Sequence, residues 1–282
     1  MTTTTTSAQL HGAKRNADCY GYTEVDGNGD AACSVLAQEC AIALSYNGIS
    51  QAVMMVTPSS LEDFVAGFSV GNGLVASLEH IYDIRITSSE TATGPALHAA
   101  VEISSRAFAS LKEQRRNMAG TSGCGLCGVE ALAQALPLLE PLPASDPPSI
   151  TQLQDLRYRI AAAQELARES GALHAALYLD GDGNVLACRE DIGRHNALDK
   201  LIGALHRQHL FQPSGFAVVT SRCSLELIQK AVRGRIATLV CLSAPTRLSV
   251  EWARAYRLNL LHVPSRSAPR LYSPAPGVHR TG

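Results

Sequence analysis

The sequence has almost no excess of charge of either sign. Its 24 lysine and arginine residues face 25 aspartate and glutamate residues, for a formal net charge of −1. Without a positive field there is nothing to hold the phosphate backbone, so nonspecific nucleic-acid binding is disfavoured. No apolar run approaches the roughly 18 residues of a membrane helix, and the N-terminus carries no signal-peptide core. These absences predict a cytoplasmic protein that binds neither nucleic acid nor membranes.

Cysteine is also sparse, with 8 in a chain of 282 residues, too few for a disulfide scaffold. Only Cys124 and Cys127 form a close pair. The other six stand alone in the sequence, and we expect no chemistry of them: Cys19, Cys33, Cys40, Cys188, Cys223 and Cys241.

Changes in composition divide the first half of the chain. Residues 1–30 are rich in Thr, Gly, Asn and Asp and predict a disordered arm. Residues 31–120 predict a small α+β domain, with a hairpin around Asn47-Gly48 and a helix that opens near Ser60 and packs onto it. The polar, basic run KEQRRN at 112–117 is interpreted as the entry to a loop. Residues 121–148 hold the cysteine pair, a short helix and a proline-rich linker.

From residue 149 to 272, helix and strand patterns alternate. The first helix is predicted over Leu153 to Ser170. The predicted strands LHAALYL and VLACRE are then joined by a turn, and single helices separate VLACRE, FAVVT, IATLVCL and LNLLHV. Such alternation predicts an α/β layer around a mixed or parallel sheet. Residues 273–282 are expected to be a disordered tail.

The pair Cys124-Gly125-Leu126-Cys127 lies between glycines, just before a predicted helix and just after Arg115 and Arg116. A helix N-terminus and nearby cations lower a thiol's pKa, which suits a nucleophile. A zinc site is disfavoured because no second ligand pair exists. A thioredoxin-like centre and a dinucleotide-binding GxGxxG loop both lack the strand that should precede them. Persulfide chemistry fits the context, and an inert structural loop stays open as the alternative.

Polar turns follow three predicted strands of the second domain. Arg194 and His195 follow the first, Ser221 and Arg222 follow the second, and Ser243 follows the third. Ligands of α/β sheets bind beyond the carboxyl ends of strands, where helix N-termini donate to anions. The three turns together therefore predict a site for phosphates and a sugar.

For any single turn a simpler reading stands beside the site. Ser221 and Thr246 could only cap helices, and Asp191 could form a weak surface ion pair with Arg194. Asp199 and Lys200, next along the helix, could be its solvated face.

Five long segments then match one family: YNGISQAVMMVTPSSLEDFVAGFSVGNGL, MAGTSGCGLCGVEAL, REDIGRHNALDKLIG, SRCSLELIQKA and SAPTRLSVEWA. Together they resemble the formate dehydrogenase accessory sulfurtransferases of the FdhD family, over about residues 35–272. The resemblance implies a cytidine-deaminase-like layered α/β domain with a mixed sheet, a smaller N-terminal α+β domain, and a homodimer. It also implies sulfur transfer from a cysteine desulfurase, through a cysteine persulfide, to the bis-molybdopterin guanine dinucleotide cofactor of formate dehydrogenase.

By the same resemblance Cys124 matches the persulfide carrier and Cys127 its partner, and the protein holds no metal of its own. The family's cofactor-binding stretch, just ahead of the last strand, falls on Val263, Pro264, Ser265, Arg266, Ser267 and Ala268. This stretch lacks the usual phenylalanine and glycine, although Arg266 could reach a phosphate. Deamination is disfavoured, since the HxE and PCxxC motifs of zinc deaminases are missing. The contrasting hypothesis is a non-catalytic cofactor chaperone whose CxxC loop is structural.

Overall fold

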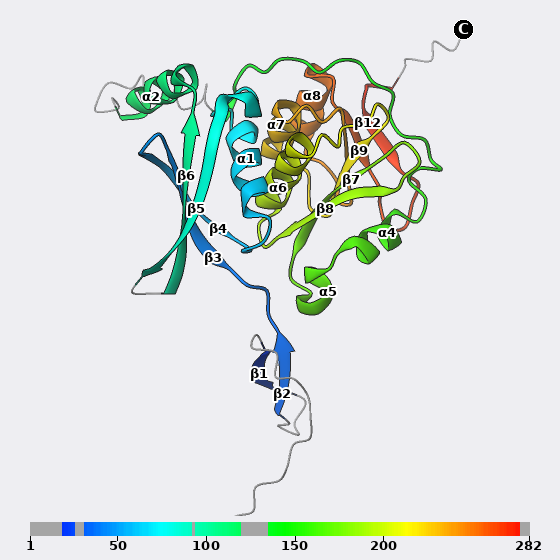
Figure 1. Cartoon of the computed structure of the whole chain (residues 1–282). Helices are drawn as coiled ribbons and strands as arrows, with labels where there is room; N and C mark the ends of the chain where they lie inside the picture. Colours follow the sequence, from blue (N-terminus) through cyan, green and yellow to red (C-terminus); the bar gives the residue numbers. More distant parts are fainter. Residues whose placement is uncertain (1–18, 26–30, 92–93, 120–134, 277–282) are drawn as a thin grey trace, which may run out of the picture.

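A computed structural model describes residues 19–25, 31–91, 94–119 and 135–276, which form a mixed α/β arrangement with three sheets (Figure 1). The four-stranded sheet has the order β4-β3-β6-β5. Asn47 and Gly48 both have positive φ, of 45° and 81°, as a tight hairpin turn requires. The predicted hairpin is therefore confirmed. The strand bounds are β3 Cys40–Tyr46, β4 Ile49–Val56, β5 Ile81–Thr91 and β6 Gly94–Ile103.

Two helices and one short 3-10 turn accompany this sheet: α1 (Leu61–Gly71), η1 (Leu78–His80) and α2 (Ser105–Ala119). The helix predicted after Ser60 is confirmed as α1. The loop entry predicted at 112–117 is wrong, because these residues continue α2. Lys, Glu, Gln and Arg are good helix formers, so a polar run can extend a helix whose Leu111 is buried.

The six-stranded sheet has the order β12-β11-β10-β9-β7-β8. Strands β9, β10 and β11 run parallel, whereas β7 is antiparallel to both of its neighbours, β8 and β9. The sheet is therefore mixed, as predicted. Its strands are β7 His174–Leu179, β8 Val185–Asp191, β9 Phe216–Val219, β10 Thr238–Cys241, β11 Asn259–His262 and β12 Arg270–Ser273.

Helices cover both faces of this sheet. On one face lie α6 (Arg194–Arg207), α7 (Leu225–Arg233) and α8 (Arg247–Ala255). The other face packs on α4 (Leu156–Ala163). The single helix predicted over Leu153–Ser170 is instead two, α4 and α5 (Leu166–Ser170). The chain breaks there because the Glu190 carboxylate accepts hydrogen bonds from the backbone amides of residues 165, 166 and 167, at 2.8–2.9 Å, which starts a new helix.

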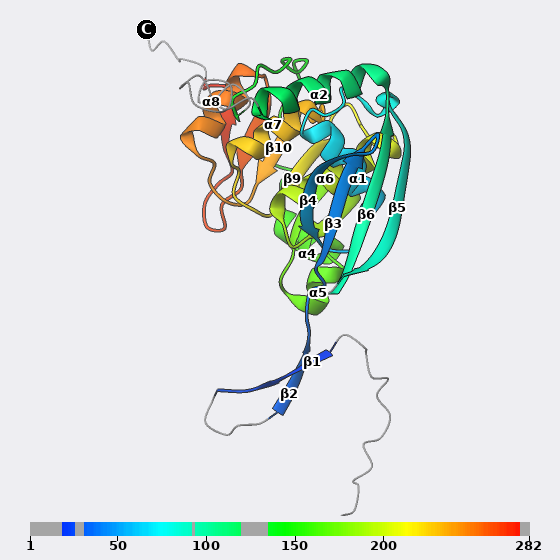
Figure 2. The ribbon, with the colours of Figure 1, turned by 90° about the vertical axis from the view of Figure 1, so that its left-hand side faces the viewer.

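Helices α1 and α6 pack closely between the two large sheets (Figures 1 and 2). The contact depends on two glycines. A Cβ on Gly67 would lie 1.7 Å from the Asp199 carbonyl oxygen, and one on Gly203 would lie 1.9 Å from that of Asp63. One hydrophobic core continues from the four-stranded sheet through these helices into the six-stranded sheet.

Strands β1 (Cys19–Thr23) and β2 (Ala31–Val35) form a hairpin that projects from the body (Figure 1). A disulfide joins Cys19 to Cys33. Both features depart from the sequence expectation of a disordered arm with isolated cysteines, since the alternating CYGYT run forms a strand. Ser273, the first residue of the predicted tail, likewise ends β12. Within the described part of the chain, no helix is both long and apolar enough to cross a membrane.

Candidate functional site

The predicted polar turns meet at one edge of the six-stranded sheet. Strands β8, β9, β10 and β11 all point the same way, because β7 is antiparallel to both β8 and β9. Their carboxyl ends are therefore neighbours, spread over roughly 19 Å if adjacent strands are about 4.8 Å apart. The edge carries Arg194, His195, Ser221, Arg222, Ser243 and the stretch Val263, Pro264, Ser265, Arg266, Ser267 and Ala268. We call it the carboxyl edge.

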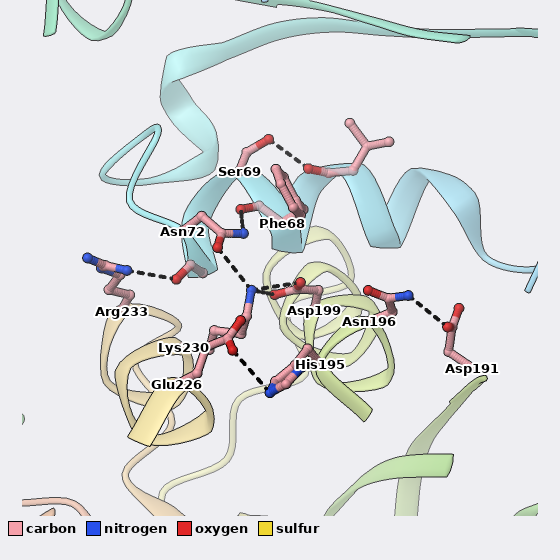
Figure 3. Close-up of polar contacts among 12 residues, drawn as sticks. Phe68, Ser69, Asn72, Asp191, His195, Asn196, Asp199, Glu226, Lys230 and Arg233 are labelled. Carbon is pink, nitrogen blue, oxygen red and sulfur yellow. Dashed lines mark hydrogen bonds and ion pairs between the residues drawn. The ribbon is translucent and has the colours of Figure 1, made fainter. Parts of the chain in front are cut away.

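Asp191, the last residue of β8, organises the first turn. Its Oδ1 accepts from the Gly193 amide at 2.8 Å. The same oxygen accepts from the Asn196 side-chain amide at 2.9 Å (Figure 3). Its Oδ2 accepts from the Thr57 amide at 3.0 Å and lies 2.7 Å from Lys200 Nζ. The turn is therefore fixed against the chain that leaves β4, on the other sheet.

The ion pair of Asp191 and Lys200 corrects two expectations. Asp191 does not form a surface pair with Arg194, and Lys200 is not on a solvated face, because both paired side chains have 0% exposure. Lys200 Nζ also donates to the Thr57 carbonyl at 2.9 Å and the Glu190 carbonyl at 3.0 Å. Burial lowers the pKa of Lys200, and the Asp191 carboxylate opposes that shift.

Arg194 and His195 begin α6 at the carboxyl edge. Arg194 Nε is buried and has no hydrogen-bond partner among the described residues. His195 Nε2 lies 3.2 Å from Glu226 Oε2 (Figure 3). It also lies 3.5 Å from Ser224 Oγ. Burial lowers the pKa of His195, and the Glu226 carboxylate opposes that shift.

His174 belongs to the same group, although sequence reasoning left it out. It begins β7, and because β7 runs antiparallel to β8 its first residue pairs with Asp191 at the carboxyl edge. Its pKa is lowered by burial and by the nearby Arg194. No sequence signal predicts this position, because the residues of β7 do not show whether the strand runs parallel or antiparallel to its neighbours.

The second and third turns differ in how their hydroxyls are used. The Ser221 hydroxyl donates to the Arg222 carbonyl at 3.2 Å and does not cap α7, whose N-cap is Ser224. Thr246 does cap α8, since its Oγ1 accepts from the Ser249 amide at 3.2 Å. The capping interpretation is therefore wrong for Ser221 and confirmed for Thr246. Ser243 is half-buried and Arg222 is exposed.

The fourth turn follows β11 and precedes β12. Residues 265–268 are exposed there. Arg157 on α4 donates to the Leu242 carbonyl at 3.4 Å and to the Val263 carbonyl at 3.1 Å, so it ties this turn to the previous one. His262 Nδ1 is buried without a partner among the described residues, and burial, Arg270 and Arg157 lower its pKa. Sequence reasoning missed Arg157 because the carbonyls that it binds come from distant segments, and His262 because nothing in the strand pattern marks its buried ring nitrogen.

A second buried ion pair joins α6 and α7, the two helices that carry His195 and Glu226. Lys230 on α7 lies 2.9 Å from both carboxylate oxygens of Asp199 and 3.2 Å from Asn72 Oδ1 (Figure 3). Burial raises the pKa of Asp199 to about 6, against the attraction of Lys230. The expectation that Asp199 is solvated is thus wrong. The pair holds α7, and with it Glu226, against α6 beside His195.

The electrostatics of the carboxyl edge suit an anion. Arg194, Arg222 and Arg266 lie at or next to its turns, Arg157 on α4 binds two of the turn carbonyls, and Lys200 already neutralises the Asp191 carboxylate. The backbone amides at the start of α6 add positive dipole. Such an edge can bind phosphate groups. No group of three or more potential metal-ligating side chains occurs among the described residues.

The predicted sulfur-carrying residues Cys124 and Cys127 lie outside the described residues, as do the side chains of Arg115 and Arg116. The structure does show what flanks them. Helix α2 leads into this segment, and the chain beyond it is attached to α7, where Gln229 Nε2 donates to the Ala135 carbonyl at 2.8 Å.

Comparison with known proteins identifies relatives along most of the chain. A sulfur carrier protein FdhD of Xanthomonas euvesicatoria pv. vesicatoria (strain 85-10) is 43% identical over 228 residues, covering 80% of this chain and 79% of that protein. The protein of the same name from Bordetella bronchiseptica is 41% identical over 238 residues, covering 84% and 85%.

The fold also has a solved counterpart. A crystal structure from Desulfotalea psychrophila, described as that of a formate dehydrogenase accessory protein, superposes with a TM-score of 0.66 at 19% sequence identity. The match covers 90% of this chain and 95% of that one, which shows that the fold is shared. The FdhD/NarQ family model matches residues 37–278. The chain belongs to the FdhD/NarQ family.

Proposed function

We propose that this protein is a sulfur carrier that takes sulfane sulfur from a cysteine desulfurase and delivers it to the bis-molybdopterin guanine dinucleotide cofactor of formate dehydrogenase. The observation that carries the proposal is the family match over residues 37–278, which spans both the cysteine pair and the carboxyl edge. The names of the relatives, sulfur carrier protein FdhD, support the same reaction.

In the proposed reaction the Cys124 thiolate attacks the outer sulfur of the donor's persulfide. A new sulfur–sulfur bond forms on Cys124, the donor's bond breaks, and the donor cysteine leaves as a thiolate. Cys127 then assists release: its thiolate attacks the inner sulfur, the outer sulfur leaves as hydrosulfide to the acceptor, and a Cys124–Cys127 disulfide results. A cellular thiol reductant returns this disulfide to the dithiol.

The carboxyl edge is the proposed binding site for the guanine dinucleotide ends of the cofactor, which is cargo and not a resident group. The buried Arg194 Nε without a partner supports this assignment, because a guanidinium there can donate to a phosphate oxygen. His195 at the start of α6 and the exposed Arg222 and Arg266 add donors along the edge. The amides of residues 263–268 can contribute whatever their side chains are.

The remaining expectations complete the proposal. We infer that the six-stranded unit is a cytidine-deaminase-like layer, that the protein acts in the cytoplasm as a homodimer, and that its protein partners are a cysteine desulfurase and the catalytic subunit of formate dehydrogenase. The mixed sheet with helices on both faces supports the first of these statements.

Intact mass spectrometry tests the carrier role. The protein is incubated with a cysteine desulfurase and cysteine, beside Cys124→Ala, Cys127→Ala and Cys188→Ala, a free cysteine that serves as the control. We expect a sulfur adduct that is lost only in Cys124→Ala, while GDP, a fragment of the cofactor, binds all four proteins equally.

The alternative function is a cofactor chaperone with a structural cysteine loop. It predicts no sulfur adduct on the wild-type protein, and formate dehydrogenase activation that survives in both Cys124→Ala and Cys127→Ala. Either result would replace the sulfur-carrier proposal with the chaperone. Loss of GDP binding in Arg194→Ala and His195→Ala is expected under both functions and tests the carboxyl edge by itself.

A further inference from the structure

A pocket lies away from the carboxyl edge, at the opposite end of α7. Its volume is about 500 Å³, within the range of roughly 300–1,000 Å³ that ligand sites occupy. Four segments line it: the end of α1 and the chain after it, the start of α2, residues 139 and 140, and the end of α7. We call it the arginine pocket, after Arg106, Arg233 and Arg235.

The arginine pocket carries more positive charge than its own residues neutralise. Arg233 forms no ion pair within the described part of the chain; its guanidinium donates to the Gly71 carbonyl at 3.1 Å. It is half-buried, and burial lowers its pKa. A partly buried guanidinium without a carboxylate is costly, so the pocket favours an anionic ligand.

The other charges do not cancel this field. Arg235 lies 3.4 Å from Glu140, the acidic residue in the lining, but the Glu140 side chain is 83% exposed and such a pair contributes little. Arg106 is exposed and forms no ion pair with any described residue. Arg235, two residues beyond the end of α7, has a φ of 60°, a left-handed conformation that is uncommon for residues other than glycine.

Aliphatic side chains form one wall of the lining. It comprises Val70, Leu74, Val75, Ala107, Leu139 and Val232, with some smaller and polar residues. Among the described residues of the lining, His80 supplies an imidazole ring and Phe, Tyr and Trp do not occur. The pocket therefore suits a ligand that combines carboxylates with aliphatic groups.

We propose that the arginine pocket binds an acidic segment of a protein partner, in which aliphatic side chains alternate with carboxylates. Guanidinium groups pair with carboxylates through two parallel hydrogen bonds, and the apolar wall receives the aliphatic side chains. The site lies on α2, which leads into residues 120–134, and on residues 139 and 140, which follow them. A docked partner thus contacts elements that flank, in the sequence, the segment that holds Cys124 and Cys127. A part in sulfur transfer rests on the proposed function, whereas peptide binding itself does not.

Fluorescence anisotropy tests the proposal with the full-length protein and a fluorescein-labelled peptide of alternating Glu and Leu. We expect saturable binding that weakens with salt and that is lost for the matched Gln-Leu peptide. Arg106→Glu and Arg235→Glu should each weaken binding at least about tenfold, the loss of one charge-assisted hydrogen bond. The control is Arg85→Glu, on β5 and outside the lining, because its side chain is 68% exposed and its loss should leave the affinity unchanged.

Three results would overturn the proposal. Equal affinity of Arg106→Glu and wild type would place the peptide elsewhere. Binding of inorganic phosphate that depends on Arg106, without binding of the Glu-Leu peptide, would make the pocket a small-anion site. Equal binding of the Gln-Leu peptide would remove the role of charge. Cys124→Ala should bind the peptide as wild type does, so failure of sulfur transfer and failure of peptide docking can be told apart.

Discussion

Removal of the Asp191 carboxylate should lower the free energy of unfolding more than removal of an exposed side chain does. In Asp191→Ala the Lys200 ammonium, with 0% side-chain exposure, keeps only neutral partners: the Thr57 and Glu190 carbonyls and the Ser59 hydroxyl. An uncompensated buried charge costs about 3–5 kcal/mol. At roughly 2–4 °C per kcal/mol, Tm should fall by about 6–20 °C.

Lys200→Met should cost less, because the Asp191 carboxylate keeps three N–H donors, from Thr57, Gly193 and Asn196. The double variant should cost less than the sum of the two, by a coupling of about 0.5–3 kcal/mol. Urea unfolding followed by circular dichroism measures all three. The control is the exposed pair of Asp83 with Arg85, where loss of the carboxylate costs about 0–1 kcal/mol. Additive costs, or an Asp191→Ala penalty no larger than that of Asp83→Ala, would refute the reasoning.

Four further predictions concern other sites. GDP affinity, measured by calorimetry, should rise as pH falls from 7 toward 5. The pKa of His195 is lowered, so its imidazole becomes positively charged, and attracts the phosphates, only in this acid range. His195→Ala should show a smaller rise. Gly67→Ala should lower the free energy of unfolding by about 3 kcal/mol or more, whereas Gly21→Ala, whose new Cβ would lie 3.8 Å from the Ala32 carbonyl oxygen, should have little effect. Thr246→Ala should cost about 1 kcal/mol through its lost helix cap, and no change in Tm would contradict the capping role. The Asp199 pKa is raised to about 6, so the wild-type free energy of unfolding should fall as pH rises from about 4 to 6, where the buried carboxyl loses its proton. Asp199→Asn lacks this proton, so its free energy of unfolding should change less over the same interval. Parallel pH profiles of the two proteins would contradict this prediction.

Local signals in the sequence predicted much of the fold. The Asn47-Gly48 turn carries its own geometry, and alternation of helices and strands after residue 149 indicated the mixed sheet. What failed depended on partners far along the chain. Glu190 splits a predicted helix by capping α5, and no pattern within residues 153–170 records that carboxylate. A projecting hairpin was missed because its strands pack on little else.

The candidate site divides in the same way. Turns that follow parallel strands could be placed at one edge from chain order alone, and Arg194, His195 and Ser221 lie there. His174 arrives at that edge only because β7 runs antiparallel. The lysine at 200 looked solvated because helix periodicity shows one buried face, whereas α6 is packed between two layers and buries Lys200 beside Asp191.

The close contact of α1 with α6 has a consequence for synthesis on the ribosome. Asp63 on α1 and Arg207 on α6, which pair across this contact, are 144 residues apart in the chain. At about 5–20 residues per second, translation takes roughly 7–30 s to cover that distance. Through this interval the glycine-bearing face of α1 has left the ribosome without its partner. The nascent N-terminal sheet therefore keeps apolar surface exposed until α6 emerges.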